Sequence, residues 1–242
     1  MRVPRFYQPN SIAVDTLISL DDNAVQHIAR VLRMRAGESI ILFNGNGDEY
    51  SGTLVEVAKR KVTVNIINCT TPDRASPLNV QIGQSISRGE RMDFAVQKST
   101  ELGVNTITPL ISERCEVKLN TDRLEKKQQQ WQQLAISACE QSLRTTVPTI
   151  NPATSLEHWL QSCTAEIKLV LHHHSHKNLD SYAKPTSVAL LVGPEGGLTQ
   201  REVDLAINAG FKAVALGPRV MRTETAPVAA LSVLQFLWGD FS

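Results

Sequence analysis

The chain has 242 residues, which is enough for one large domain or two modest ones with a substantial core. With 20% charged and 42% hydrophobic residues, its composition excludes collagen-like, coiled-coil and wholly disordered proteins. The 25 basic and 24 acidic residues give a formal net charge of +1, which argues against binding nucleic acid through a basic tail but allows a local basic surface.

Targeting and redox signals predict a cytoplasmic protein. No apolar run reaches about 18 residues, so we expect no transmembrane helix. The stretch from Met1 to Arg5 lacks the apolar segment of a secretory signal. The cysteines form no Cys-x-x-Cys pair, so we expect reduced, buried thiols. These residues are Cys69, Cys115, Cys139 and Cys163.

The first helix is predicted between Asp21 and Leu32. Either Asp21 or Asp22 can cap its start. Val25, Ile28 and Leu32 share one face, which we expect to be buried. This helix interrupts a segment that otherwise has the pattern of strands.

Three strands follow this helix. Residues 39–43 form a short apolar run, and the turn sequence at 44–47, Asn-Gly-Asn-Gly, predicts a hairpin. Residues 50–57 and 61–67 then alternate between apolar and polar positions. The Gly-x-Gly of the turn lacks the third glycine of a dinucleotide-binding motif, and no helix pattern follows it. Several short strands and one helix favour a small barrel.

A turn-rich stretch at 70–76 separates this segment from the rest. We therefore expect two domains, residues 1–72 and residues 73–242. In the second, strands and helices alternate, which predicts an α/β fold with a mostly parallel sheet. The expected strands cover 78–82, 107–111, 168–171, 188–192 and 213–216, and the expected helices cover 90–102, 122–143, 156–163, 199 onward and 227–238.

Two glycine-bearing loops of this second domain each leave a strand and enter a helix. The first loop contains Val192, Gly193, Pro194, Glu195, Gly196 and Gly197. By itself it is compatible with a tight turn, but a proline and a carboxylate inside the turn favour a ligand site. The second loop contains Leu216, Gly217, Pro218, Arg219, Val220, Met221, Arg222, Thr223, Glu224, Thr225 and Ala226. Because ligands bind outside the carboxyl ends of parallel strands, we expect both loops to meet at one pocket.

The two loops, GPEGG and LGPRVMRTETA, resemble those of the ribosomal RNA small subunit methyltransferase E family, of the SPOUT superfamily. The resemblance extends along the whole chain in the right order. Its further elements are Arg30–Met34, Glu101–Val104 with Pro109, Ser112–Arg114 and Glu140–Arg144.

This resemblance implies more than the patterns do. It implies an N-terminal PUA-like β-barrel that grips RNA and a C-terminal SPOUT-type parallel-sheet α/β domain with a deep trefoil knot. Periodicity alone indicates a Rossmann-like domain, since knots are rare. The resemblance also implies a homodimer that uses S-adenosylmethionine to methylate N3 of a uridine in 16S ribosomal RNA of the small ribosomal subunit. No metal is required for this reaction.

The resemblance assigns site residues by position. The cofactor-binding residues are Leu171, His172, Val192, Gly193, Pro194, Glu195, Gly196, Gly197, Leu216, Gly217, Pro218, Val220, Met221, Arg222, Thr225 and Ala226. Negative charge spreads onto the uracil oxygens when N3 loses its proton, so a fixed cation should help, and Arg222 is our candidate. Glu224 is the nearest candidate base; it could instead orient Arg222 or Thr223.

Basic residues of the N-terminal domain form the candidate RNA-binding surface. They are Arg2, Arg5, Arg30, Arg33, Lys59, Arg60 and Lys61. Each taken alone also fits a solvated surface, and Arg33 also fits a structural role at a helix end. Phe6 and Tyr7 could stack on bases, but we favour a place in the strand core.

Three alternatives stay open at this point. The histidines between His172 and His176 could suggest a metal site, but no cysteine lies beside them, and we favour a polar loop. The second alternative is a non-catalytic RNA-binding protein of the same fold, although such a protein would not need both loops. The third alternative is a SPOUT enzyme that methylates another nucleotide, because the same site residues would serve that reaction.

Overall fold

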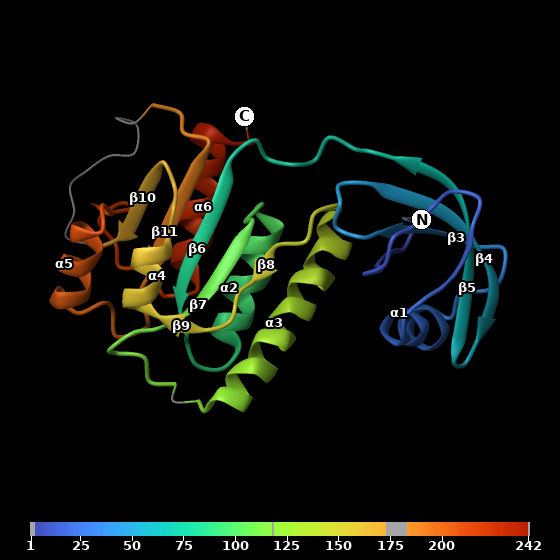
Figure 1. Ribbon diagram of the computed structural model, residues 1–242, viewed down its shortest axis with the longest axis horizontal. Helices are drawn as coiled ribbons and strands as arrows, with labels where there is room; N and C mark the ends of the chain where they lie inside the picture. Colours follow the sequence, from blue (N-terminus) through green and yellow to red (C-terminus); the bar gives the residue numbers. More distant parts are fainter. Residues whose placement is uncertain (1–2, 118, 173–182, 242) are drawn as a thin grey trace. The chain divides into compact units, whose positions relative to one another are not determined.

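The computed structural model describes residues 3–117, 119–172 and 183–241 (Figure 1). Its internal contacts divide the chain into two compact units. Unit 1 comprises Met1–Ala75 and Cys139–Val147, and unit 2 comprises Ser76–Ala138 and Pro148–Ser242. The sequence division at 72/73 did not foresee that a short segment after residue 138 returns to the N-terminal unit.

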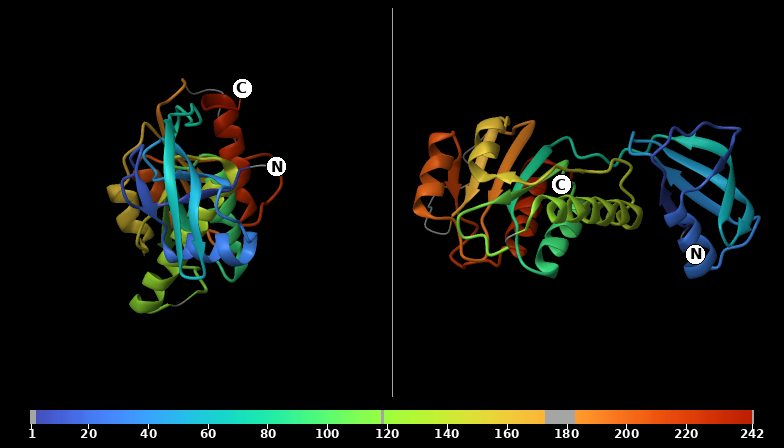
Figure 2. Two further views of the ribbon diagram at one scale, coloured as in Figure 1. Left: turned by 90° about the vertical axis from the view of Figure 1, so that its right-hand side faces the viewer. Right: turned by 60° about the horizontal axis from the view of Figure 1, so that its bottom comes forward.

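Unit 1 contains a five-stranded sheet in the order β1-β3-β4-β5-β2. The strands are β1 (Arg5–Tyr7), β2 (Leu17–Ser19), β3 (Ser39–Phe43), β4 (Glu49–Ala58) and β5 (Lys61–Thr70). β1 lies parallel to β3, whereas the other neighbours are antiparallel. The long hairpin of β4 and β5 is visible in Figure 2.

Local sequence explains the unit 1 sheet. Gly45 and Gly47 both have positive φ, 89° and 104°, which the predicted hairpin turn between β3 and β4 requires. Val62, Val64 and Ile66 on β5 are fully buried, as their alternation predicted. The polar residues between them face away from this core.

The predicted helix of unit 1 is only half α-helical. Asp21 caps α1 (Asp22–Gln26) by accepting a hydrogen bond from the Ala24 N–H at 2.8 Å. The chain then widens into a π-helix, η1 (His27–Leu32). Ile28 is fully buried, but Leu32 is exposed, contrary to the α-helical expectation. A π-helix bonds residue i to i+5, so residues beyond Ile28 leave the face that a period of 3.6 predicts.

Unit 2 is built on a seven-stranded parallel sheet in the order β12-β10-β11-β6-β7-β8, with β9 also paired to β7. Its strands are β6 (Asn79–Ser85), β7 (Thr106–Ile111), β8 (Thr149–Ile150), β9 (Thr154–Ser155), β10 (Ile167–Leu171), β11 (Ser187–Val192) and β12 (Lys212–Val214). The predicted parallel α/β fold is thus confirmed. The short strands β8 and β9 were not predicted.

Helices cover both faces of this sheet (Figure 1). One core contains side chains of α2 (Glu90–Glu101), α3 (Thr121–Ser142) and α6 (Thr225–Trp238). The other contains side chains of α4 (Leu156–Ser162) and α5 (Gln200–Asn208). Both cores include residues of the central strands.

The central strand β11 shows why its sequence is continuously apolar. Val188, Leu190 and Val192 belong to the core with α2, α3 and α6. Ala189 and Leu191 belong to the core with α4 and α5. Because both faces of the strand are buried from Val188 to Val192, a polar residue at any of these positions would have a cost.

Helix ends in unit 2 follow the predicted signals. Thr199 and Glu202 form both hydrogen bonds of a capping box at the start of α5. Ser155 caps α4 by accepting from the His158 N–H. Pro227 lies in the first turn of α6, where its missing N–H costs nothing. The last strand, however, ends at Val214 rather than at Leu216.

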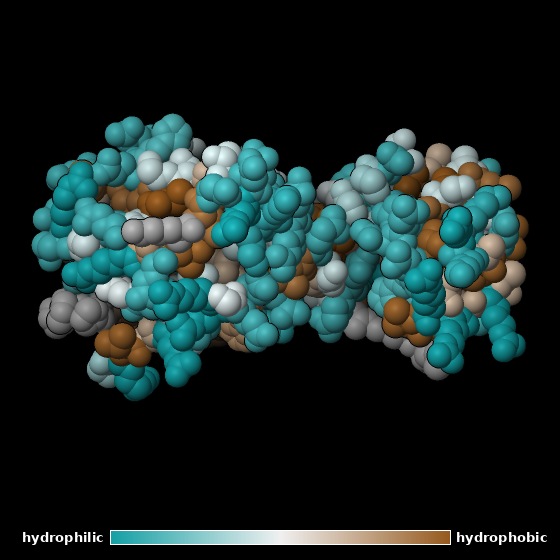
Figure 3. Space-filling view, turned by 90° about the horizontal axis from the view of Figure 1, so that it is seen from below, coloured by the Kyte–Doolittle hydropathy of each residue, from teal (hydrophilic) through white to brown (hydrophobic). Residues whose placement is uncertain are grey.

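The surface seen in Figure 3 is mostly hydrophilic, with hydrophobic residues in small groups. Within the described residues, no helix combines the length and the apolar character that crossing a membrane requires. All four cysteines are free thiols. Cys139 and Cys163 are buried, and burial raises the pKa of each to about 11. Cys69 and Cys115 are only partly buried, contrary to expectation.

Candidate functional site

A pocket of about 560 Å³ lies at the carboxyl ends of β10, β11 and β12. The two glycine-bearing loops meet there, as the parallel sheet predicted. The lining residues are Arg91, Arg114, Leu171, His172, Val192 to Leu198, Val214 to Gly217, Arg219 to Glu224, and Ala226. Of the residues expected at a cofactor, only Pro218 and Thr225 lie outside this lining.

Two glycines of the first loop pack closely against their neighbours. A Cβ atom on Gly193 would lie 3.0 Å from Cγ of Leu198 and 3.1 Å from its backbone nitrogen. A Cβ on Gly196 would lie 3.3 Å from Cβ of Arg114, whose guanidinium donates to the Gly196 carbonyl at 2.9 Å. Side chains at these two positions would crowd Leu198 and Arg114, and Arg114 holds the loop in place. The glycines leave backbone groups open to a ligand.

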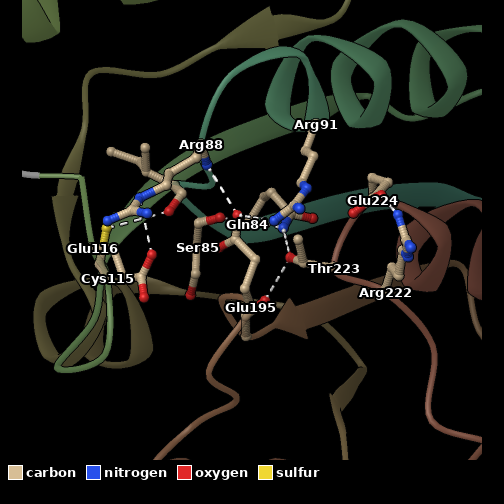
Figure 4. A network of polar contacts seen from close by, with 12 residues as sticks. Gln84, Ser85, Arg88, Arg91, Cys115, Glu116, Glu195, Arg222, Thr223 and Glu224 are labelled. Atoms are coloured by element: carbon tan, nitrogen blue, oxygen red, sulfur yellow. Dashed lines mark hydrogen bonds and ion pairs between the residues drawn. The ribbon is translucent and has the colours of Figure 1, made fainter.

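Glu195, in the middle of this loop, is held by the start of α2 (Figure 4). Its Oε1 accepts from the Arg88 backbone N–H at 3.0 Å and from Nη1 of Arg91 at 2.9 Å. Burial acts to raise the pKa of Glu195, but these hydrogen bonds outweigh it, and the pKa lies below its ordinary value. The carboxylate is thus ionised at neutral pH and anchors the loop.

The second loop is tied to the first through Thr223. Its hydroxyl donates to the Gly193 carbonyl at 2.7 Å and accepts from Nε2 of Gln84 at 3.1 Å (Figure 4). Both side chains are buried. Hydrogen bonds beside the pocket therefore connect three segments of the chain: β6, the first loop and the second loop.

Arg222 and Glu224 lie apart from the Glu195 group (Figure 4). From its place in the loop, we expected the Arg222 side chain to reach into the pocket. It is instead 80% exposed, so it lies at the pocket mouth. Its Nη1 lies 4.0 Å from Oε1 of Glu224, whose side chain is only 15% exposed. The other oxygen of Glu224 is buried and has no hydrogen-bond partner among the described residues.

His172 follows β10 and lines the pocket, and its backbone N–H donates to the Val214 carbonyl at 2.9 Å. The rest of the histidine tract, from His173 to His176, lies outside the described residues. Elsewhere in the part of the chain that the structure describes, no group of three or more His, Cys, Asp or Glu residues could hold a metal ion.

Most of the candidate RNA-binding residues of unit 1 lie at the surface. Arg30, Arg33, Lys59, Arg60 and Lys61 are exposed. Lys61 also pairs with Glu56 at 2.8 Å. Arg2 lies outside the described residues.

The assignment of Arg5 to the RNA surface is wrong. Arg5 is 6% exposed and forms an ion pair with Glu49, and its guanidinium lies over the ring of Phe43. It also donates to the Arg144 carbonyl at 3.0 Å. A buried cation with these partners stabilises the fold and is not available to bind RNA. The neighbouring Phe6 is also core, as favoured above.

Sequence reasoning missed several lining residues, of which Arg91 and Arg114 are the most informative. A signal for Arg91 did exist. It follows β6, whose carboxyl end lies at the same edge of the sheet as that of β11, because the two strands are parallel neighbours. Polar residues that follow any strand of such a sheet are candidates for the site.

Comparison with known proteins identifies both units. A family model described as RNA methyltransferase domain matches residues 74–235. A second, described as RNA methyltransferase PUA domain, matches residues 20–67. Ribosomal RNA small subunit methyltransferase E of Buchnera aphidicola subsp. Schizaphis graminum is 36% identical over 100% of this chain and 99% of its own.

The chain belongs to the ribosomal RNA small subunit methyltransferase E family. The Bacillus subtilis member is 34% identical over 90% of this chain and 89% of its own. A crystal structure of the Neisseria gonorrhoeae member, bound to S-adenosyl methionine, is 44% identical and matches with a TM-score of 0.94 over 100% of both chains. The resemblance in the loops and along the chain is thus confirmed, as is the fold class of a PUA domain followed by a SPOUT-type domain.

Proposed function

We propose that this protein methylates N3 of a uridine in 16S ribosomal RNA, with S-adenosylmethionine as the methyl donor. Membership of the family supports S-adenosylmethionine-dependent ribosomal RNA methylation. The choice of N3 of uridine rests on the whole-chain resemblance. The observation that carries the proposal is the pocket where the GPEGG and RTETA loops meet at the edge of a parallel sheet.

The pocket has features that suit this cofactor. Leu171, Val192, Leu216 and Met221 offer apolar walls, and the bare glycine loop offers backbone N–H and C=O groups. We propose that the residues assigned by position hold the cofactor, including Pro218 and Thr225 at the margin of the lining. When bound, the cofactor supplies an electrophilic methyl group on a sulfonium. The walls then exclude water and orient the reacting atoms.

We propose that Arg222 and Glu224 act on the base. The exposed guanidinium of Arg222 stands where it can meet a uracil oxygen at the pocket mouth, and it would stabilise charge as N3 loses its proton. The unpartnered carboxylate oxygen of Glu224 can accept that proton. If Glu224 only orients Arg222, the proton passes to solvent instead.

We propose that unit 1 binds the RNA backbone. Arg30, Arg33, Lys59, Arg60 and Lys61 are exposed cations on a domain whose family match is a PUA domain of RNA methyltransferases. The substrate would be 16S RNA within the small ribosomal subunit, and the protein would act in the cytoplasm. Arg2 remains in this proposal as a further contact.

We also propose a homodimer formed through unit 2. The side chains of Val233, Phe236 and Leu237 on α6 and of Phe241 after it are all exposed. A contiguous patch of exposed apolar side chains is a common sign of a protein interface. A two-fold dimer is the commonest closed assembly, and one helix face can meet its own copy across such an axis.

The decisive experiment uses small subunits from a strain that lacks this protein. Purified protein and S-adenosylmethionine are added, and the modified nucleosides in 16S RNA are identified and located by mass spectrometry. We expect a single 3-methyluridine. A different methylated nucleoside would indicate another target, and protein that binds RNA but shows no heat of binding with S-adenosylmethionine would indicate a non-catalytic binder.

A further inference from the structure

We infer that Gln84 is a positioning residue for the cofactor pocket, acting through the hydroxyl of Thr223 on the Gly193 carbonyl. This inference rests on the function proposed above. Gln84 lies on β6 and does not line the pocket, whereas Thr223 and Gly193 do. It was not among the site residues that the sequence suggested.

The direction of each hydrogen bond is fixed by counting hydrogens. Nε2 of Gln84 has two hydrogens, and it donates to the Ser85 carbonyl at 3.3 Å and to Oγ1 of Thr223 at 3.1 Å. Because the Thr223 hydroxyl accepts there, its single hydrogen is directed to the Gly193 carbonyl at 2.7 Å. Gln84 thus sets the orientation of the Thr223 hydroxyl.

The frame that carries this chain of bonds is rigid. Gln84 pairs in register with Val192, so it sits beside the last residue of β11, where the glycine loop begins. Gln84 and Thr223 are 1% and 6% exposed, so water does not compete for their hydrogen bonds. The link therefore joins the central sheet to both loops of the pocket.

A buried glutamine at this position has a cost that its packing does not explain. Its Oε1 is buried and has no hydrogen-bond partner among the residues that the structure describes. An unsatisfied buried acceptor typically destabilises a fold by about 1–3 kcal/mol. An apolar side chain of the same size would avoid this cost but could not donate the hydrogen bond from Nε2 to Thr223.

The hydrogen bonds from Gln84 through Thr223 to Gly193 affect cofactor binding because they hold the two loops in place. Gly193 lies on one wall of the pocket. The other wall is formed by the segment that contains Thr223, including Met221, Arg222 and Glu224. If these walls are held in place before binding, less conformational entropy is lost when the cofactor binds. Without the link, the walls move independently and cofactor affinity falls.

The test is a double-mutant cycle on the full chain, with S-adenosylmethionine affinity measured by calorimetry. Gln84→Met keeps the size and removes the hydrogen bonds, and Thr223→Val removes the hydroxyl. We expect each to weaken binding about 10-fold, equivalent to about 1.4 kcal/mol. Because both break the same link, the double variant should also be about 10-fold weaker, not about 100-fold.

Two further variants separate positioning from general damage. Thr223→Ser keeps the hydroxyl and should bind within about twofold of the unchanged protein. Ser85→Ala is the matched control, because Ser85 is the buried neighbour on the same strand and its hydroxyl has no partner among the described residues. It should not change affinity, and combined with Thr223→Val it should be additive.

Several results would overturn the inference. These are unchanged affinity in Thr223→Val, failure of Thr223→Ser to restore binding, or an additive 100-fold loss in the double variant. If Gln84→Met does not fold, the comparison of Thr223→Val with Thr223→Ser still decides. If the unchanged, folded protein does not bind S-adenosylmethionine at all, the proposed function itself fails, and the inference fails with it.

Discussion

At the scale of single residues, charge type alone does not tell which arginines face solvent. Arg5 and Arg30 have the same side chain and lie in the same unit, yet only Arg30 is exposed. Arg5 is buried because Glu49 and the Arg144 carbonyl reach it from distant parts of the chain. No local pattern could have shown those partners, so the sequence placed both residues on the RNA surface.

Arg5→Ala should therefore damage the fold rather than RNA binding. Removing one member of a buried pair typically costs about 3–5 kcal/mol, and we expect the lower end because Arg74 also contacts Glu49 at 2.6 Å. Urea unfolding at pH 7 measures the loss. The control is Arg30→Ala, an exposed site whose stability should stay within about 0.5 kcal/mol. Equal stability of both variants would contradict the burial argument.

Arg222→Ala tests the cation at the pocket mouth. If Arg222 stabilises charge on the uracil, single-turnover methylation should fall about 100- to 1000-fold, while S-adenosylmethionine affinity changes only a few fold. Arg222→Lys should recover part of the rate, because lysine keeps the charge without the planar fork. If Arg222 only braces the loop, cofactor affinity and melting temperature would fall together with the rate.

At the scale of elements, the structure shows which signals are local. Caps, the hairpin turn and the strand alternations depend on neighbouring residues, and these were predicted correctly. The π-helical turn and the short strands β8 and β9 depend on tertiary packing, and they were not predicted. The two pocket loops were recognisable from their glycines, and Arg91 could have been found from its place after β6, but Gln84 could not, because its role depends on which segments are its neighbours in the fold. The trefoil knot stays a prediction.

The link between the glycine loop and α2 gives a pH-dependent prediction. The pKa of Glu195 is lowered in the folded protein, so its ionised form stabilises the fold above the ordinary carboxyl value of 4.5. This contribution is lost as the pH falls through the lower folded value. Glu195→Gln should lower stability at pH 7 by about 1.5 kcal/mol, the scale of a hydrogen bond to a charged group.

Urea unfolding of both proteins between pH 7 and pH 3 checks this sign. The difference in unfolding free energy between the unchanged protein and Glu195→Gln should be constant near neutral pH. It should begin to shrink below about pH 4.5 and vanish only below the lower folded pKa. Glu113→Gln gives the comparison with an exposed ion pair. The hydrogen bond from Arg201 also lowers the pKa of Glu113, so the effect should have the same sign but be smaller, because solvent screens the pair. A difference that grows as the pH falls would show that Glu195 is not held as an anion.

At the scale of the whole molecule, the proposed dimer follows from apolar side chains that the fold of one chain leaves exposed. Phe236 is 62% exposed on α6, whereas Leu231, Leu234 and Trp238 of the same helix are buried in the core. Light scattering at micromolar concentration should give twice the 26.7 kDa mass of one chain. Phe236→Glu should shift this toward the single-chain mass, whereas Ile207→Glu, an exposed apolar residue on α5, should not.

The return of Cys139–Val147 to unit 1 has a consequence for how the protein is made. The Tyr7 N–H finds its acceptor on Glu140, and Arg5 finds one on Arg144, so the N-terminal unit needs residues from the far end of α3. As the chain leaves the ribosome, its first strands must wait for these contacts until more than half of the polypeptide has been synthesised. The unit that emerges first is thus completed only by a segment that is synthesised later.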